Sequence, residues 1–110
     1  MTIEIIEKAT IVKDFGSNLD QLLSELEIKQ QDLKTSNVIL DISSYCSLKP
    51  KDLNIFLSYA KILKTNNKSF VIVIDDFDFT KASTKINIVP TLQEAYDIIE
   101  LEEIERDLGF

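Results

Sequence analysis

Two short runs of β-branched residues open the chain. Ile3, Ile5 and Ile6 form the first run, residues 10–12 form the second, and only residues 7–9 separate them. Runs of this composition favour extended strands, and a short connection between them favours antiparallel pairing. The first twelve residues therefore predict a hairpin of two strands.

The pattern then changes from strand spacing to helical spacing. Gly16, Ser17 and Asn18 interrupt the apolar positions and supply a residue that can cap a helix. The leucines that follow have the i, i+3, i+4, i+7 spacing of a one-sided helix: Leu19, Leu22, Leu23 and Leu26. We expect one helix that reaches about Leu33 and packs through this stripe.

Two longer apolar runs follow, at residues 38–42 and 69–75, and a shorter one lies at residues 86–89. Continuous apolar runs are typical of strands that are buried on both faces, so residues 38–42 should form the central strand. Between the two longer runs, Pro50 suits the first turn of a helix that Asn66 and Asn67 end. Its apolar positions again have helical spacing: Leu53, Phe56, Leu57, Ala60 and Leu63.

The end of the chain predicts an amphipathic helix. Thr91 and Glu94 have the spacing of a capping box. The apolar positions after them form a broad stripe: Leu92, Ala95, Ile98, Ile99, Leu101, Ile104 and Leu108. We expect the stripe to be covered by the body of the protein or by a second chain, with the acidic side chains on the outer face.

This order of elements predicts an α/β fold. Helices that alternate with buried strands imply parallel pairing through right-handed crossovers, and the opening hairpin adds an antiparallel pair. We expect a mixed sheet of about five strands with about three helices, in a single domain that spans residues 1–110. A hydrophobic content of 45%, with two glycines and two prolines, is typical of a folded chain of this size.

Charge is concentrated at the end of the chain. Residues 91–110 hold seven acids and one base, a net charge of −6, so residues 1–90 account for only −1 of the total of −7. An acidic helix on a nearly neutral body suggests a surface that a partner recognises. The sequence shows no cluster of lysine and arginine, which argues against a nucleic-acid partner.

The sequence shows no pattern of a targeting signal or a membrane-spanning segment. Residues 1–20 hold four acids and no long apolar run, and the longest apolar run, residues 70–74, is far too short to cross a membrane. Cys46 is the only cysteine, so an internal disulfide is excluded. We expect a cytoplasmic protein without membrane insertion.

The segment VILDISSYCSLKPKDLNIFLSYAKIL, residues 38–63, resembles the STAS domain of anti-sigma factor antagonists and of the cytoplasmic tails of sulfate transporters. That family ends a strand in an Asp-Leu-Ser-like triplet before a loop and a helix, and residues 41–43 keep it as Asp-Ile-Ser. The order of elements is similar over nearly the whole chain. The resemblance implies a STAS-like fold and a role in binding a regulatory protein.

The motif that follows the triplet departs from the family. Counting from Asp41, the family's acidic residue falls on Lys49, its phosphorylated serine on Pro50, its second serine on Lys51 and its glycine on Asp52; only its leucine is kept, as Leu53. Proline has no hydroxyl that could accept a phosphoryl group. Ser44 or Ser47 could replace the missing serine, although turn and cap hydrogen bonds are the commoner use of such residues.

The absence of histidine restricts the chemistry. The chain has no histidine, which excludes Ser-His-Asp triads, Cys-His dyads and histidine-rich zinc sites. The ending PTLQEAYDIIELEEIERDLGF also resembles that of short bacterial proteins, some of which carry the label ribonuclease Z. That enzyme needs a histidine-rich two-metal site, so its activity is excluded here.

Aspartates near strand ends offer one catalytic alternative. Asp41, Asp75 and Asp76 follow two neighbouring strands, and Asp78 lies just beyond. Carboxylates at this edge of a parallel sheet could share Mg²⁺ in a small phosphotransfer protein. Capping of turns is the commoner role of such residues.

The sequence favours a non-enzymatic binding domain without a cofactor or metal. Its expected partner is a regulatory protein, and a homodimer formed through the last helix is the alternative assembly. The residues expected to contact the partner lie in the loop after the central strand and on the acidic helix: Ser44, Ser47, Pro50, Lys51, Asp52, Glu102, Glu103 and Glu105.

Overall fold

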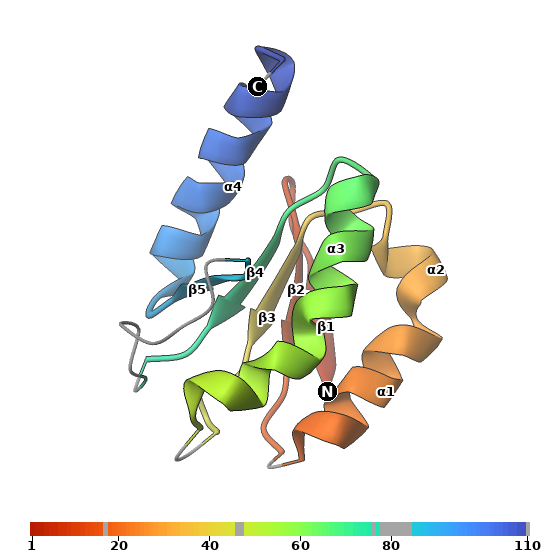
Figure 1. The fold of residues 1–110 in the computed structure, drawn as a ribbon, viewed down its shortest axis with the longest axis vertical. Helices are drawn as coiled ribbons and strands as arrows, with labels where there is room; N and C mark the ends of the chain where they lie inside the picture. The colour runs from red at the N-terminus through yellow and green to blue at the C-terminus, as the bar shows by residue number, and fades with distance from the viewer. Residues whose placement is uncertain (17, 46–47, 76, 78–84, 110) are drawn as a thin grey trace.

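Five strands lie side by side in the order in which they occur along the chain (Figure 1). The computed structural model describes residues 1–16, 18–45, 48–75, 77 and 85–109. The strands are β1 (Thr2–Ile5), β2 (Thr10–Lys13), β3 (Val38–Asp41), β4 (Phe70–Val73) and β5 (Asn87–Val89). The helices are α1 (Leu19–Ile28), α2 (Gln30–Leu33), the 3-10 helix η1 (Pro50–Phe56), α3 (Leu57–Thr65) and α4 (Leu92–Asp107).

The sheet is mixed, as the sequence predicts. β1 pairs with β2 in antiparallel orientation, and β2, β3, β4 and β5 are parallel to one another. The register aligns Val12 with Leu40 and Leu40 with Ile72. The α/β class, the hairpin and the central position of β3 are therefore confirmed.

Both faces of the sheet are covered, which explains the continuous apolar runs in β3 and β4. On one face, strand residues such as Leu40 and Ile72 pack against α1, α2, η1 and α3. On the other face, Ile39 and Val71 pack against Ala95 and other residues of α4. All four residues of β3 and of β4 are buried.

The helix boundaries follow local hydrogen bonding. The Asn18 side chain accepts a hydrogen bond from the N–H of Gln21, as expected of a cap. The single helix expected up to Leu33 is instead two helices, because the chain turns at Lys29 between α1 and α2. Pro50 begins its helix as predicted, but the first seven residues are 3-10 helix rather than α-helix.

Asparagines end α3, as predicted. Asn67 adopts a left-handed backbone conformation with φ of 60°. The N–H of Lys68 donates to the carbonyl of Leu63 at 2.8 Å, and the N–H of Asn67 donates to the carbonyl of Lys64 at 3.0 Å. This is the hydrogen-bond pattern of a Schellman motif, and it turns the chain sharply into β4.

The connection from β4 to β5 is described only in part. Phe77 is half-buried and packs in the same apolar cluster as α1 and α3. Among the helices that the structure describes, none is long and apolar enough to cross a membrane.

Candidate functional site

The loop that the sequence singles out leaves the carboxyl end of β3. Ser44 is exposed, and its hydroxyl donates a hydrogen bond to the backbone carbonyl of Asp14 at 3.1 Å. This bond ties the loop to the residue that follows β2. The Ser44 side chain thus takes part in loop structure, and Ser47 and Cys46 lie outside the described residues.

Asp14 organises this edge of the sheet, although sequence reasoning assigned it no role. Its carboxylate accepts hydrogen bonds from the Tyr45 hydroxyl and from the N–H of Gly16, the latter at 3.3 Å, and lies 3.5 Å from the N-terminal ammonium group. Burial, together with the Asp14 carboxylate, raises the pKa of Tyr45 far above its usual value. An Asp directly after a buried strand could have indicated this role. The second strand was expected to end at Val12, whereas β2 ends at Lys13, directly before Asp14.

Gly16 has little free space beside this aspartate. A Cβ at Gly16 would lie 3.1 Å from Oδ2 of Asp14 and 3.6 Å from the Tyr45 hydroxyl oxygen. The first distance is tighter than ordinary van der Waals contact, so a larger residue would press on the Asp14 carboxylate. Glycine therefore allows the close turn between β2 and α1.

Pro50, Lys51 and Asp52 form the first turn of η1. The Asp52 carboxylate accepts a hydrogen bond from the N–H of Lys49 at 2.8 Å, and the N–H of Asp52 donates to the carbonyl of Lys49 at 2.9 Å. Asp52 therefore caps this helix, and the Lys51 side chain is exposed. Of the described residues expected to contact a partner in this loop, Ser44 and Asp52 already have structural bonds.

The strand-end aspartates of the catalytic alternative are placed as the sequence predicts. Asp41 ends β3, and Asp75 follows the adjacent β4. The Asp41 carboxylate is buried, accepts a hydrogen bond from the N–H of Ser43 at 3.1 Å, and lies 4.0 Å from Nζ of Lys13. Asp75 is exposed, and Asp76 and Asp78 lie outside the described residues. Within the described part of the chain, no group of three or more acidic or cysteine side chains is arranged to hold a metal ion.

The acidic residues of α4 do not all face outward, so that expectation is wrong in part. Glu102 faces the sheet edge, where its carboxylate accepts a hydrogen bond from the Asn87 amide at 3.0 Å. Glu103 is half-buried, and its Oε1 is buried without a hydrogen-bond partner among the described residues. Glu105 is exposed. One turn further on, Arg106 donates to the Ser69 hydroxyl at 3.1 Å.

The distal apolar residues of α4 are exposed rather than packed on the body. Ala95 and Ile99 are buried, whereas Leu101, Ile104 and Leu108 are 56%, 56% and 66% exposed. We name these three residues the α4 outer stripe. Of the two expected coverings, the body of the protein therefore does not cover them, and coverage by a second chain stays a prediction. In Figure 1 the end of α4 extends beyond the sheet, away from the other helices.

A groove lies between α3 and α4, beside the start of β4 and β5. Its volume is about 900 Å³. Five basic residues line it: Lys61, Lys64, Lys68, Lys85 and Arg106. Glu102 and Glu105 are the acids of its lining. We call it the basic groove. The sequence argument that the chain has no basic cluster therefore does not hold for the folded protein.

The two groups of residues expected to contact the partner are far apart. Residues 43–52 follow the carboxyl end of β3, whereas α4 starts at that end and runs back past the amino ends of the strands (Figure 1). Glu102, Glu103 and Glu105 therefore lie at the opposite end of the sheet from Ser44, Pro50 and Lys51. A partner contacting both would have to span the molecule.

Comparisons with known proteins add no assignment. No protein-family model matches the chain, and no curated protein matches it.

Proposed function

We propose that the protein is a non-enzymatic binding domain that docks a basic amphipathic helix of a regulatory protein on the outer face of α4. The observation that supports this proposal is the α4 outer stripe. Leu101, Ile104 and Leu108 follow one another at intervals of three and four residues, so they lie on one face of the helix. They expose more than half of their surface to water.

The free energy available at this stripe is substantial. Complete burial of a leucine or isoleucine side chain is worth about 1.5–3 kcal/mol. Since more than half of each side chain remains exposed, a partner could gain about 1–2 kcal/mol from each of the three. A contact of this kind favours a partner that also presents apolar side chains at helical spacing.

Charge around the stripe favours a basic partner. By the helical period of 3.6 residues, Glu100 and Asp107 border one side of the stripe and Glu105 borders the other. Glu105 and Asp107 are exposed, and Glu100 pairs with Lys8 at 3.3 Å. A helix with lysine or arginine beside its apolar positions would complement this surface. A second copy would place acidic borders against acidic borders.

The proposal keeps the resemblance to STAS domains at the level of element order and binding role. It places the partner on α4 rather than on residues 43–52, because Ser44 and Asp52 already serve the loop and the first turn of η1. Pro50 also provides no hydroxyl for a phosphoryl switch. The Mg²⁺ alternative at Asp41, Asp75, Asp76 and Asp78 stays a prediction.

The test is an NMR titration of the ¹⁵N-labelled protein with a synthetic helical peptide of leucines and lysines. We expect amide shifts centred on residues 100–108, and a loss of affinity of about tenfold or more when Leu101 and Ile104 are both replaced by serine. A peptide with glutamate in place of lysine should bind far more weakly. The control is Ile3→Ser/Ile5→Ser, which alters exposed apolar residues of β1 and should leave the affinity unchanged.

Two outcomes contradict the proposal. Shifts that spread over all acidic surfaces, and that do not change in the Leu101→Ser/Ile104→Ser variant, would mean that only net charge attracts the peptide. Sedimentation that shows a dimer of the free protein, converted to a monomer by the same variant, would mean that a second copy occupies the stripe.

A further inference from the structure

We propose that the basic groove binds a small molecule that carries two or more phosphate groups. The groove has five basic residues against two acids, a local balance of +3 in a chain of net charge −7. Its basic residues come from α3, the turn after it, the segment just before β5, and α4. Folding therefore gathers positive charge at one hollow of an acidic protein, which attracts a multivalent anion.

Three of these cations are not neutralised by neighbours. In the described residues, no ion pair joins Lys61, Lys64 or Lys68 to a carboxylate. Lys61 and Lys64 lie one turn apart on α3, and the left-handed turn at Asn67 returns the chain so that Lys68 lines the same groove. These ammonium groups keep their charge available for a ligand.

Arg106 is held in place on the opposite wall. One of its N–H groups donates to the Ser69 hydroxyl at 3.1 Å, and Ser69 is itself buried directly before β4. The guanidinium carries five N–H donors in a fixed plane, and this bond is the one it makes within the described chain. The remaining donors suit the oxygens of a phosphate group, which guanidinium groups often bind in a bidentate manner.

The two acidic residues of the groove do not neutralise the charge of Arg106. The Glu102 carboxylate is bound by the Asn87 amide at 3.0 Å, which holds it against the start of β5. Glu105 lines the groove and is exposed. Neither acid forms an ion pair with Arg106 among the described residues.

Size and lining favour a small ligand over a polymer. A volume of about 900 Å³ falls within the range of about 300–1,000 Å³ that is usual for small-molecule sites. Leu57, Ala60 and Phe70 add apolar surface that a carbon skeleton could contact. Because each phosphate group carries a charge of about −1.5 to −2 near neutral pH, two phosphates would balance the excess charge of the groove.

The test uses ¹⁵N-labelled protein titrated separately with inorganic triphosphate and with fructose 1,6-bisphosphate. Both share phosphate chemistry, and the second shows whether a carbon skeleton contributes to affinity. We expect amide shifts at residues 67–70, Asn87 and Arg106. The Lys64→Ala/Lys68→Ala variant should bind about tenfold more weakly or worse. Each substitution removes an ammonium group and its hydrogen bond to a charged phosphate oxygen.

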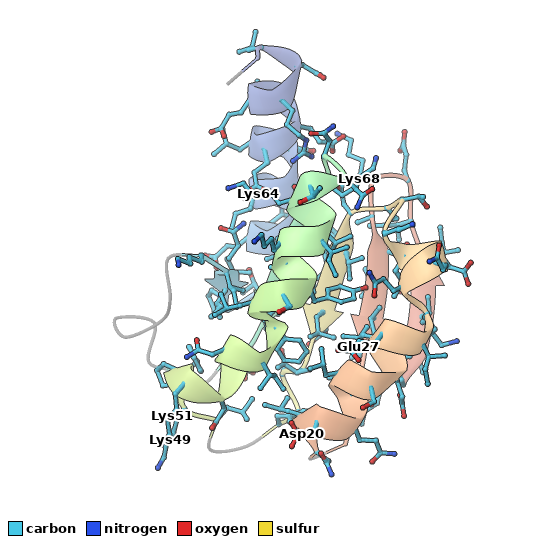
Figure 2. The ribbon with its side chains drawn as sticks, turned by 45° about the vertical axis from the view of Figure 1, so that its right-hand side comes forward. Asp20, Glu27, Lys49, Lys51, Lys64 and Lys68 are labelled. Carbon is cyan, nitrogen blue, oxygen red and sulfur yellow. The ribbon has the colours of Figure 1, made fainter. Side chains whose placement is uncertain are left out.

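A matched control is available at the other end of the same helical segment. Lys49→Ala/Lys51→Ala removes two exposed lysines as well, but these flank the start of η1, far from Lys64 and Lys68 (Figure 2). Its affinity should stay within about twofold of the unaltered protein, allowing for the small long-range effect of charge. Retention of dispersed NMR signals checks that each variant is folded.

The following results would overturn the proposal: no shift at a ligand concentration of about 10 mM, well above a weak dissociation constant of about 1 mM; an equal loss of affinity in both lysine variants; or binding of single inorganic phosphate as tight as that of triphosphate. Tighter binding of poly-glutamate would assign the groove to an acidic polypeptide instead. The Leu101→Ser/Ile104→Ser variant should bind triphosphate normally, so this test and that of the α4 outer stripe can fail separately.

Discussion

Replacement of Ile99 and of Ile104 by alanine, in two separate variants, tests the orientation of α4. Both residues are isoleucines of the same helix, but Ile99 is 1% exposed and Ile104 is 56% exposed. Ile99 packs with Val71, Val73 and other residues of the core between α4 and the sheet. The two substitutions remove the same atoms from opposite environments.

The expected free energies of unfolding differ clearly. Removal of a buried isoleucine side chain to alanine costs about 2–5 kcal/mol, because apolar contacts are lost and a cavity remains. Full burial of an isoleucine side chain is worth about 1.5–3 kcal/mol, and less than half of this can be lost at Ile104 because the residue is mostly exposed. The better helix propensity of alanine offsets a few tenths of a kcal/mol of that loss. We expect a loss of about 1 kcal/mol or less for Ile104→Ala.

Urea denaturation followed by far-ultraviolet circular dichroism measures both changes, and it suits a chain without tryptophan. With a denaturant slope of about 1.5 kcal/mol/M, Ile99→Ala should lower the urea midpoint by about 1–3 M and Ile104→Ala by less than about 0.7 M. Equal losses would refute the orientation of α4 described above. If the loss at Ile104 also grew with protein concentration, a second copy would be covering the stripe.

Two further predictions concern buried polar groups. Burial raises the pKa of Tyr59 to about 12. In the unfolded chain a tyrosine side chain has a pKa of about 10, so between about pH 10 and pH 12 the unfolded state binds fewer protons than the folded state. The free energy of unfolding should therefore fall as pH rises through this range. Tyr59→Phe should lessen that fall in urea midpoints and should be neutral or stabilising near pH 7, because the Tyr59 hydroxyl is buried without a hydrogen-bond partner among the described residues. Asn37→Ala should lower the free energy of unfolding by about 2–3 kcal/mol, since the buried Asn37 side chain donates to the Lys8 carbonyl and accepts from the N–H of Ser69, both at 2.8 Å. If Asn37→Ala lowered the free energy of unfolding by less than about 0.5 kcal/mol in the same urea assay, the two hydrogen bonds of Asn37 would not stabilise the fold as described.

Much of the sheet could be predicted because its signals are local. The apolar runs of β3 and β4 require burial on both faces, and Asn18, Pro50 and Asn67 act on their immediate neighbours. The break at Lys29 was not predicted, because the leucine stripe continues with helical spacing through it.

The apolar positions of α4 form two stripes rather than one. At about 100° per residue, Leu101 and Ile104 lie about 140–160° around the helix from the buried Ile99, so they face away from the sheet. In the same turns the side toward the sheet carries polar residues, where Glu102 accepts a hydrogen bond from Asn87 and Arg106 donates one to Ser69. Because each stripe has helical spacing, the two were expected to form one broad stripe.

The basic groove could not be predicted because its residues are distant in sequence. Lys61 and Arg106 lie on different elements that cover opposite faces of the sheet. They meet only because β4 and β5 pair at the edge between α3 and α4. Similarly, the role of Asp14 depends on Tyr45, which belongs to a loop thirty-one residues away.

The order of strands has a consequence for synthesis of the chain. Each strand pairs with the strand made just before it, so β1 to β4 can assemble while the rest of the chain is still being translated. The helices of one face are complete by Thr65, but Ile39 and Val71 on the other face have no helix above them until α4 emerges. The nascent protein therefore carries an uncovered apolar surface until α4 has been translated, and Ala95 and Ile99 of that helix are the residues that cover it.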